Sequence, residues 1–148
     1  MDFSAGRSVE RARLTTLTRL LVGLEVFIGL GALAGGGLLM LSPDGRLLGM
    51  RLSVLDGTPF KDFLVPGLVL FTAIGVVPLA AAAAALRRMR VAPVLAVAVG
   101  VLLVGWIAVE MVMLAGPGSL AWSLYLFLGT AVLVLGAVWL RAETGSQD

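Results

Sequence analysis

Four long apolar runs dominate this sequence and restrict what the chain can fold into. They cover residues 17–41, 63–86, 91–114 and 120–140, which together make up about two thirds of the 148 residues. Each run is at least as long as the roughly 20 residues that an α-helix needs to cross the hydrocarbon core of a bilayer. The mean hydropathy of +1.05 and the hydrophobic content of 59% lie well above the values typical of soluble proteins. The runs therefore predict an all-α membrane protein with four transmembrane helices.

Short connections favour a single bundle domain. The segment Arg87-Arg88-Met89-Arg90 links the second and third runs, and Gly116-Pro117-Gly118-Ser119 links the third and fourth. Links this short make neighbouring helices antiparallel, which predicts an up-down-up-down bundle. The predicted single domain, 1–148, has helices at about 17–41, 59–87, 91–114 and 119–140, a loop at 42–58, and tails at 1–16 and 141–148.

Basic residues are distributed unevenly between the two sides of the predicted bundle. Most of the arginines fall on the side of the two termini, whereas the opposite side holds only Arg46, Arg51 and Lys61, beside three aspartates. By the positive-inside rule, this bias predicts cytoplasmic termini and an external 42–58 loop, in a bacterial plasma membrane. The arginines of the richer side are Arg7, Arg11, Arg13, Arg19, Arg87, Arg88, Arg90 and Arg141.

The loop at 42–58 has a pattern of its own. Ser42-Pro43-Asp44-Gly45 fits a type I turn, with Pro at the second position and Gly at the fourth. The apolar residues of Met50–Val54 then alternate with polar ones, a period typical of extended chain. Thr58-Pro59 fits a helix N-cap followed by Pro at the first helical position. We therefore expect a short extended or hairpin cap between the first two helices, with the second helix beginning near residue 59.

Glu25 is an ionisable residue within the first apolar run. Residues 4, 7 and 11 positions further on are Gly29, Ala32 and Gly36, so Glu25 shares a helix face with small residues that favour close packing. Burying a carboxylate in a membrane is costly, so we expect a hydrogen-bonded or protonated group. The candidate partners are Thr72, Thr130 and the backbone groups freed by Pro78. A binding role and a packing role are both open for Glu25.

Glu110 lies near the outer end of the third run. At that depth it can meet the loop, where Arg46, Arg51 and Lys61 are the available counter-charges. A salt bridge that fixes the loop is the favoured role, with ligand contact as the alternative. Glu25 and Glu110 fall in opposite halves of the membrane, about 15 Å apart at 1.5 Å per helical residue. A paired acid–base site is therefore not expected.

The composition argues against most chemistry. The chain has no Cys and no His, which removes the residues of most metal, haem, thiol and imidazole sites. It carries no nucleophile elbow, P-loop, dinucleotide fingerprint or zinc-protease motif. The basic residues flank the apolar runs, where they set topology and do not indicate nucleic-acid binding. We expect no enzymatic activity, no metal and no cofactor.

Two resemblances bear on function. A single membrane-embedded Glu in the first of four helices resembles the small multidrug resistance exporters. That resemblance implies a proton-coupled exporter that uses Glu25, with Trp106 and Tyr125 in the substrate pocket.

The second resemblance covers most of the chain. The segments Ser42-Pro43-Asp44-Gly45, Leu48-Gly49-Met50 and Thr58–Gly67, followed by Trp106-Ile107 and Glu110, are similar to a family of uncharacterised small four-helix bacterial membrane proteins. This resemblance implies the architecture and no activity.

The remaining functional class is a binding or accessory protein. A large share of the chain is packing surface, and the first run carries a Gly31-x-x-x-Gly35 motif among many small residues. Small residues of this kind serve packing inside the bundle or association between copies. We expect a small integral protein that packs in the lipid bilayer with itself or with a larger membrane complex. A proton-coupled transporter is the alternative.

Overall fold

The described part of the protein is entirely helical. A computed structural model describes residues 3–113 and 120–145, with side chains described for 14–112 and 123–145. Four of its helices are long and apolar enough to cross a membrane, which confirms the all-helical membrane class. The link at 116–119 and the side chains of Arg7, Arg11 and Arg13 lie outside the described residues. The four candidate spans are Leu14–Leu41, Leu64–Leu86, Ala92–Val112 and Ser123–Thr144.

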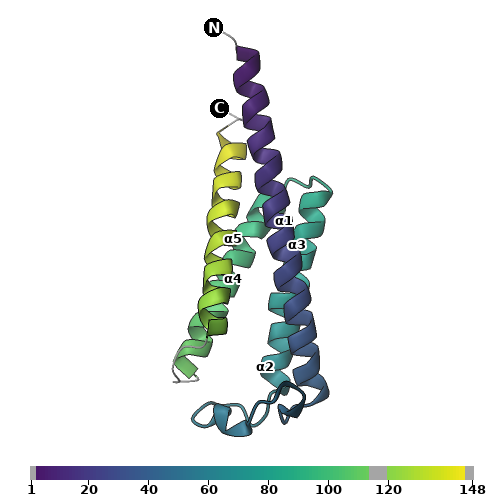
Figure 1. The fold of residues 1–148 in the computed structure, drawn as a ribbon, viewed down its shortest axis with the longest axis vertical. Helices are drawn as coiled ribbons and strands as arrows, with labels where there is room; N and C mark the ends of the chain where they lie inside the picture. The colour runs from purple at the N-terminus through teal and green to yellow at the C-terminus, as the bar shows by residue number, and fades with distance from the viewer. Residues whose placement is uncertain (1–2, 114–119, 146–148) are drawn as a thin grey trace.

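The helices lie roughly along one long axis (Figure 1). Helix α1 begins at Phe3, not near residue 17, so most of the predicted N-terminal tail continues the first helix. The beginning of α1 and the end of α5 lie at one end of the molecule, and the loop between α1 and α2 lies at the other (Figure 1). The elements are α1 (Phe3–Leu41), η1 (Arg46–Leu48), η2 (Leu52–Leu55), α2 (Leu64–Val69), η3 (Leu70–Val76), α3 (Val77–Leu86), α4 (Ala92–Met113) and α5 (Leu120–Thr144).

The second span begins at Leu64, five residues after the predicted start. Thr58 is not its N-cap: the Thr58 hydroxyl donates to the Leu55 carbonyl at 2.8 Å and accepts from the Phe60 N–H at 3.2 Å, which closes a local turn. Phe63 is the N-cap residue, and the carboxylate of Asp62, just before it, accepts from the first helical N–H, that of Leu64, at 2.9 Å. A carboxylate satisfies a free N–H group at a helix start and favours the positive end of its dipole, which moves the start to Leu64.

The middle of the second span is a π-helix. In η3 the Val77 N–H donates to the Thr72 carbonyl, five residues back rather than four. Pro78 has no N–H to donate to Ile74, and its ring crowds that carbonyl, so the wider turn immediately precedes the proline. The sequence marked Pro78 as a distortion site. Pro66, the other marked proline, lies in the first turn of α2, where its missing N–H needs no partner.

The loop between α1 and α2 is not extended. Among the described residues there is no strand, and the two short segments η1 and η2 are 3₁₀ turns. The alternation at Met50–Val54 was therefore misleading, because a strand needs a partner for its backbone groups and none lies alongside. Those groups bond locally instead, from Val54 N–H to the Arg51 carbonyl and from Asp56 N–H to the Ser53 carbonyl.

The loop is nevertheless well anchored to the helices. The predicted turn is present, with the Gly45 N–H donating to the Ser42 carbonyl at 2.9 Å. Gly45 has φ +78°, and a Cβ there would lie 2.9 Å from the ring of Phe63, so only glycine fits. The Phe63 N–H donates to the Pro43 carbonyl at 2.8 Å, which joins the two ends of the loop. Phe63 itself is buried with Leu39 and Leu55 in a small apolar cluster.

Glycines bring α1 and the second span into close contact. A Cβ on Gly36 would lie 2.6 Å from the Phe71 amide nitrogen and 2.7 Å from the Gly67 carbonyl oxygen. A Cβ on Gly29 would lie 2.7 Å from the Leu79 side chain. In the Gly31-x-x-x-Gly35 motif, a Cβ on Gly35 would lie at an ordinary 3.7 Å from the Leu70 side chain, and one on Gly31 would face Tyr125 of α5. Small residues on one face thus let the two backbones touch, and α1 forms a first helix pair with α2–η3–α3.

In the second helix pair, α4 with α5, glycines also bring the two backbones into close contact. A Cβ on Gly100 would lie 2.6 Å from the backbone of Leu133, and one on Gly136 would lie 2.9 Å from the Val97 amide nitrogen. Both positions are buried. Each glycine faces the opposite helix of the pair, so the two contacts lock α4 to α5.

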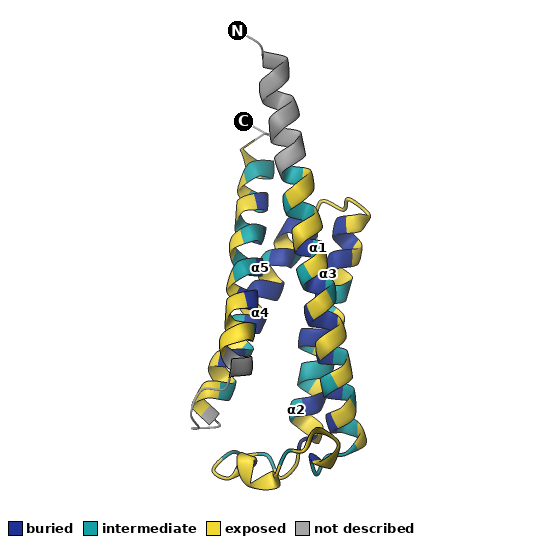
Figure 2. Ribbon diagram, in the orientation of Figure 1, coloured by how far each residue is buried: buried dark blue, intermediate teal, exposed yellow. Residues whose placement is uncertain are grey.

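The two helix pairs meet mainly at one end. We call the end with the α3–α4 turn the turn end, and the end with residues 42–63 the loop end. Small buried residues join the pairs toward the turn end, where they line the inner faces of α3 and α4 (Figure 2). Toward the loop end the ribbons of the two pairs diverge (Figure 1). The joining residues include Ala81, Ala84, Ala85, Ala92 and Ala96.

A candidate binding crevice at the loop end

Two cavities lie between the helix pairs where they diverge. The first has a volume of about 130 Å³ and lies under the loop, with walls from Met50, Phe60 and Phe63. The second has a volume of about 210 Å³ and lies deeper, against the small residues of α1 at Gly31, Ala32 and Gly35. Both are lined by Leu70, Trp106 and Glu110, so the cavities adjoin. We call the two together the crevice.

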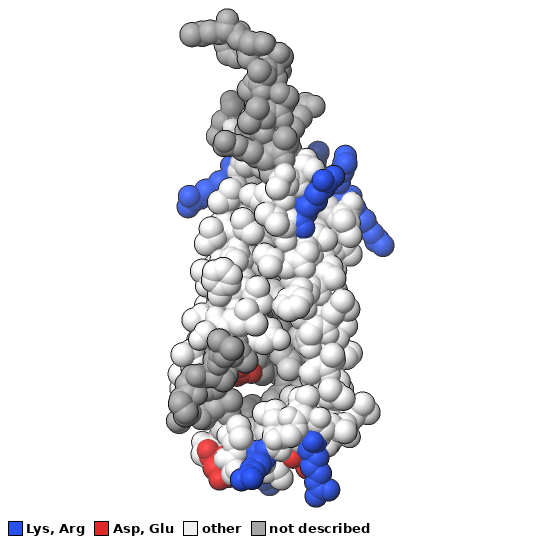
Figure 3. Space-filling model, viewed as in Figure 1, with Lys and Arg blue, Asp and Glu red and all other residues white. Residues whose placement is uncertain are grey.

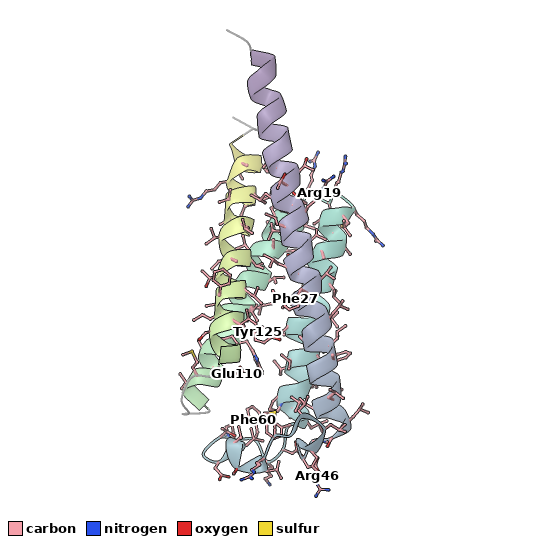
Figure 4. The ribbon with its side chains drawn as sticks, viewed as in Figure 1. Arg19, Phe27, Arg46, Phe60, Glu110 and Tyr125 are labelled. Carbon is pink, nitrogen blue, oxygen red and sulfur yellow. The ribbon has the colours of Figure 1, made fainter. Side chains whose placement is uncertain are left out.

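The crevice has few polar groups in an otherwise apolar wall. Glu110 is half-buried, and its carboxyl lies beside the side chain of Trp106, one helical turn before it. The Tyr125 hydroxyl of α5 lies across the deeper cavity, 3.6 Å from where a Cβ on Gly31 would be. Figure 4 shows Glu110 and Tyr125 at the gap between the helix pairs, above the loop that carries Phe60. An apolar site with a few converging polar groups is typical of small-molecule binding.

Electrostatically, the crevice is set apart from the ends of the molecule. Lys and Arg gather at the two ends, and the belt between them is almost free of charge (Figure 3). A hollow opens in the lower half of that view, and atoms of an acidic residue are visible at it. Among the described residues that line the two cavities, Glu110 is the one charged side chain.

The expected salt bridges to Glu110 are wrong. Arg46 turns away and pairs with Asp44, with Nε and Oδ2 2.9 Å apart, and its side chain is 87% exposed. Arg51 and Lys61 are exposed as well, and among the described side chains neither forms an ion pair with Glu110. An arginine that stays in water avoids the cost of desolvation, which an ion pair in the crevice would have to offset. Arg46, Arg51 and Lys61 therefore belong to the loop surface and not to the site.

Asp44 organises the loop turn. Its carboxylate accepts hydrogen bonds from the Ser42 hydroxyl and from the Arg46 N–H. These two bonds, with the charge of Arg46, hold the pKa of the Asp44 carboxyl below its usual value. A charged Asp44 thus stabilises the turn of the loop over the crevice.

Glu25 lies outside the crevice, in the core. Its side chain is 1% exposed, and the fully buried Leu21 and Ile28 flank it on the same face of α1. Its Oε1 is buried without a hydrogen-bond partner. Glu25 does not line either cavity of the crevice, so the structure, like the sequence, keeps Glu25 and Glu110 apart.

The expected hydroxyl partners of Glu25 are wrong. The Thr72 hydroxyl donates to the Leu68 carbonyl at 2.7 Å, and the Thr130 hydroxyl donates to the Leu126 carbonyl at 2.8 Å. Both bonds lie within one helix, where a Thr hydroxyl reaches the carbonyl four residues back. Both threonines are exposed and so face away from the buried carboxyl.

Two members of the crevice were hard to find from sequence. Leu70 lines both cavities because it begins η3. The sequence feature that indicated a distortion there was Pro78, eight residues further along. Phe60 lines the shallower cavity because the loop ends at Leu64 and not at residue 59. Trp106, Tyr125 and Glu110 were candidates from the sequence, and the structure brings these three together.

No protein-family model, no curated protein and no solved structure matches this chain. The resemblances to the four-helix bacterial family and to the small multidrug resistance exporters therefore remain predictions. The class defined by the fold is that of an all-helical protein with four helices of membrane-spanning length.

Proposed function

We propose that this chain is a small integral membrane binding protein of the accessory type, whose site is the crevice. Its ligand is an amphipathic molecule with an apolar body and one cationic or hydrogen-bond-donating group. The observation that carries this proposal is the lone carboxylate of Glu110 in an apolar space between two helix pairs, with no ion pair to neutralise it among the described residues.

The chemistry of the walls supports this ligand class. An intramembrane carboxylate is expensive, and a cationic guest would offset part of that cost. Trp106 and Tyr125 add aromatic faces that favour a cation. The leucine, valine and phenylalanine side chains of the two cavities leave room only for apolar atoms elsewhere, so one polar head on an apolar body fits the site.

Binding of alkyl compounds with matched chains tests the proposal. The full chain in lipid nanodiscs should bind an alkylamine more tightly than the alkanol of equal length, and the alkanol more tightly than the carboxylate. Glu110→Gln should remove the preference for the amine over the alcohol. Asp56→Asn, which removes one exposed charge at the same end, should leave the preference intact. Equal binding of all three compounds, or a preference that survives Glu110→Gln, would refute a charged site in the crevice.

The proposed topology is an up-down-up-down bundle with both termini in the cytoplasm and residues 42–58 as an outer cap. The basic bias of the turn end supports it. Because the chain lacks Cys, single cysteines at Ser8, Ser53 and Ser146 have no background. An impermeant thiol reagent applied to intact bacterial cells should label only the Ser53→Cys variant. Labelling of the other two variants with Ser53→Cys spared would reverse the topology.

A proton-coupled transporter is the second candidate, favoured by the buried and unpaired Oε1 of Glu25. In that case Glu25→Gln, which keeps the shape and removes the titration, should abolish proton-coupled uptake in proteoliposomes. In a packing role, Gln should be tolerated, whereas Lys should disrupt the core. If proton flux with candidate amines does not depend on Glu25, the transporter proposal is wrong.

As an accessory protein, the chain is proposed to associate with further copies or with a larger membrane complex. Its support is the apolar belt, where large side chains such as Phe27, Val112 and Phe127 are more than half exposed. Lipid can cover the same belt, so mild-detergent purification followed by native mass spectrometry is the test. A mass of one copy, with no retained protein partner, would limit the partners to lipid and ligand.

A further inference from the structure

A third cavity lies at the turn end and is different in character. It has a volume of about 560 Å³ and is formed by the turn-end part of α1, the α3–α4 turn and the last turns of α5. Three arginines line it, namely Arg19, Arg88 and Arg90. We call this cavity the basic pocket. It lies at the opposite end from the crevice and shares no lining residue with it, so its occupant is independent of the crevice ligand.

Arg88 is held in an unusual backbone conformation at this pocket. Its φ is +54°, and it is the one non-glycine residue with positive φ among those described. The Met89 N–H donates to the Ala84 carbonyl and the Arg88 N–H donates to the Ala85 carbonyl, which is the Schellman pattern at a helix end. That position usually holds glycine, because a side chain there is strained. A residue that lines the basic pocket thus carries backbone strain.

The wall behind the arginines is apolar. Leu14 of α1 and Leu86 and Met89 of the α3–α4 segment line the pocket together with the buried ring of Trp139. Leu86 and Met89 are 69% and 47% exposed, so their side chains are open to whatever covers this end. A guest with a charged head and an apolar tail would contact both parts of the pocket.

One acidic residue, Glu143, also lines the pocket. The Trp139 Nε1–H donates to Glu143 Oε1 at 3.0 Å, which holds that carboxylate against α5. Among the described residues that line the pocket, three arginines and one glutamate give a net positive charge. Basic pockets between transmembrane helices bind anionic lipid headgroups by this combination of charge and position.

We infer that the basic pocket binds the headgroup of one anionic phospholipid from the leaflet at the turn end. The phosphodiester lies among Arg19, Arg88 and Arg90, which offer planar paired donors to phosphate oxygens. One acyl chain lies along Leu86 and Met89. The strained conformation of Arg88 is the cost of pointing this side chain at the lipid.

Lipid retention by the full chain tests this inference. The protein is extracted from vesicles that contain phosphatidylcholine and phosphatidylglycerol, and the bound lipids are counted by native mass spectrometry. Phosphatidylglycerol should be enriched over phosphatidylcholine in the wild type. Each of Arg19→Gln, Arg88→Gln and Arg90→Gln should lower the enrichment about fivefold. Arg87→Gln, in the same turn but outside the pocket, should leave it unchanged.

Arg88→Gly separates lipid binding from folding. Glycine fits the left-handed position, so this variant should unfold in phosphatidylcholine at the same temperature as the wild type or higher, yet lose the enrichment. Enrichment that survives in Arg88→Gly would overturn the inference. An equal loss in Arg87→Gln would overturn it too, because it would indicate diffuse surface charge. Inorganic phosphate that raised the unfolding temperature as much as phosphatidylglycerol would exclude a lipid as the ligand.

Discussion

The turn end and the loop end of this bundle consist of similar helices but differ in how tightly the two helix pairs pack. At the turn end alanines fill the space between the helix pairs, and the core leaves little room around Glu25. At the loop end the same pairs diverge, and side chains of α4, η3 and the loop enclose adjoining cavities beside Glu110. Small residues on facing helices close the bundle at the turn end. At the loop end the helix pairs diverge, and cavities remain between them.

The two carboxylates show what this difference means for chemistry. Glu25 is buried with an unpartnered oxygen and lines neither cavity of the crevice. Glu110 is half-buried, lies beside Trp106 and lines an open cavity. Position in the packing, and not residue type, therefore distinguishes the core carboxyl of Glu25 from Glu110, the carboxyl of the proposed site.

The largest expected difference in stability is between alanine substitutions at two neighbouring glycines, Gly36 and Gly35. Gly36→Ala places a Cβ against the Phe71 and Gly67 backbones and should lower the free energy of unfolding by about 3 kcal/mol, because backbone atoms must move. Gly35→Ala places its Cβ 3.7 Å from Leu70, an ordinary contact, and should leave stability unchanged or raise it by up to about 1 kcal/mol. Reversible unfolding in mixed micelles measures both variants. Equal losses would mean that the first helix pair is not packed through Gly36.

Substitution by leucine at the two carboxylates should change the free energy of unfolding in opposite directions. Glu25→Leu removes a buried oxygen without a partner and should raise the free energy of unfolding by about 2 kcal/mol. Glu110→Leu removes a half-buried polar group beside Trp106 and should lower it by about 1 kcal/mol, while abolishing the amine preference. The same unfolding assay applies. A loss of stability in Glu25→Leu would show that Glu25 has a partner within the membrane.

How far the sequence predicts this molecule depends on the range of the interactions. Hydrophobic length alone identified the spans, because a bilayer demands about 20 apolar residues in any context. The conformation of Met50–Val54 was missed because period-2 alternation implies a strand only where a partner strand exists. The predicted ion pair at Glu110 does not form, because water competes for Arg46 and the neighbouring Asp44 supplies a closer charge. The site trio of Trp106, Glu110 and Tyr125 was predictable by type, whereas the volume beside it depends on where two helix pairs diverge.

Acid should weaken the loop over the crevice, which is the smallest effect expected. The folded protein holds the pKa of Asp44 below its usual value, so charged Asp44 stabilises the fold above the ordinary aspartate range near pH 4. That contribution is lost as the pH falls through the lowered pKa. The unfolding temperatures of wild type and Asp44→Asn should therefore differ at neutral pH and converge in acid. Asp56→Asn serves as the control and should not show this convergence, since its exposed carboxyl accepts no such hydrogen bonds from the described residues.

Photolabelling with a diazirine-bearing alkylamine in nanodiscs tests most directly whether the crevice at the loop end, and not the packed core around Glu25, is the amine site. Peptide mass spectrometry maps the labelled positions. The label should concentrate on residues that line the crevice, on η3, α4 and the loop, and unlabelled alkylamine should compete for it. Glu110→Gln should remove the competed fraction. Labelling spread evenly over lipid-facing positions such as Phe27 and Val134, without competition, would contradict the account.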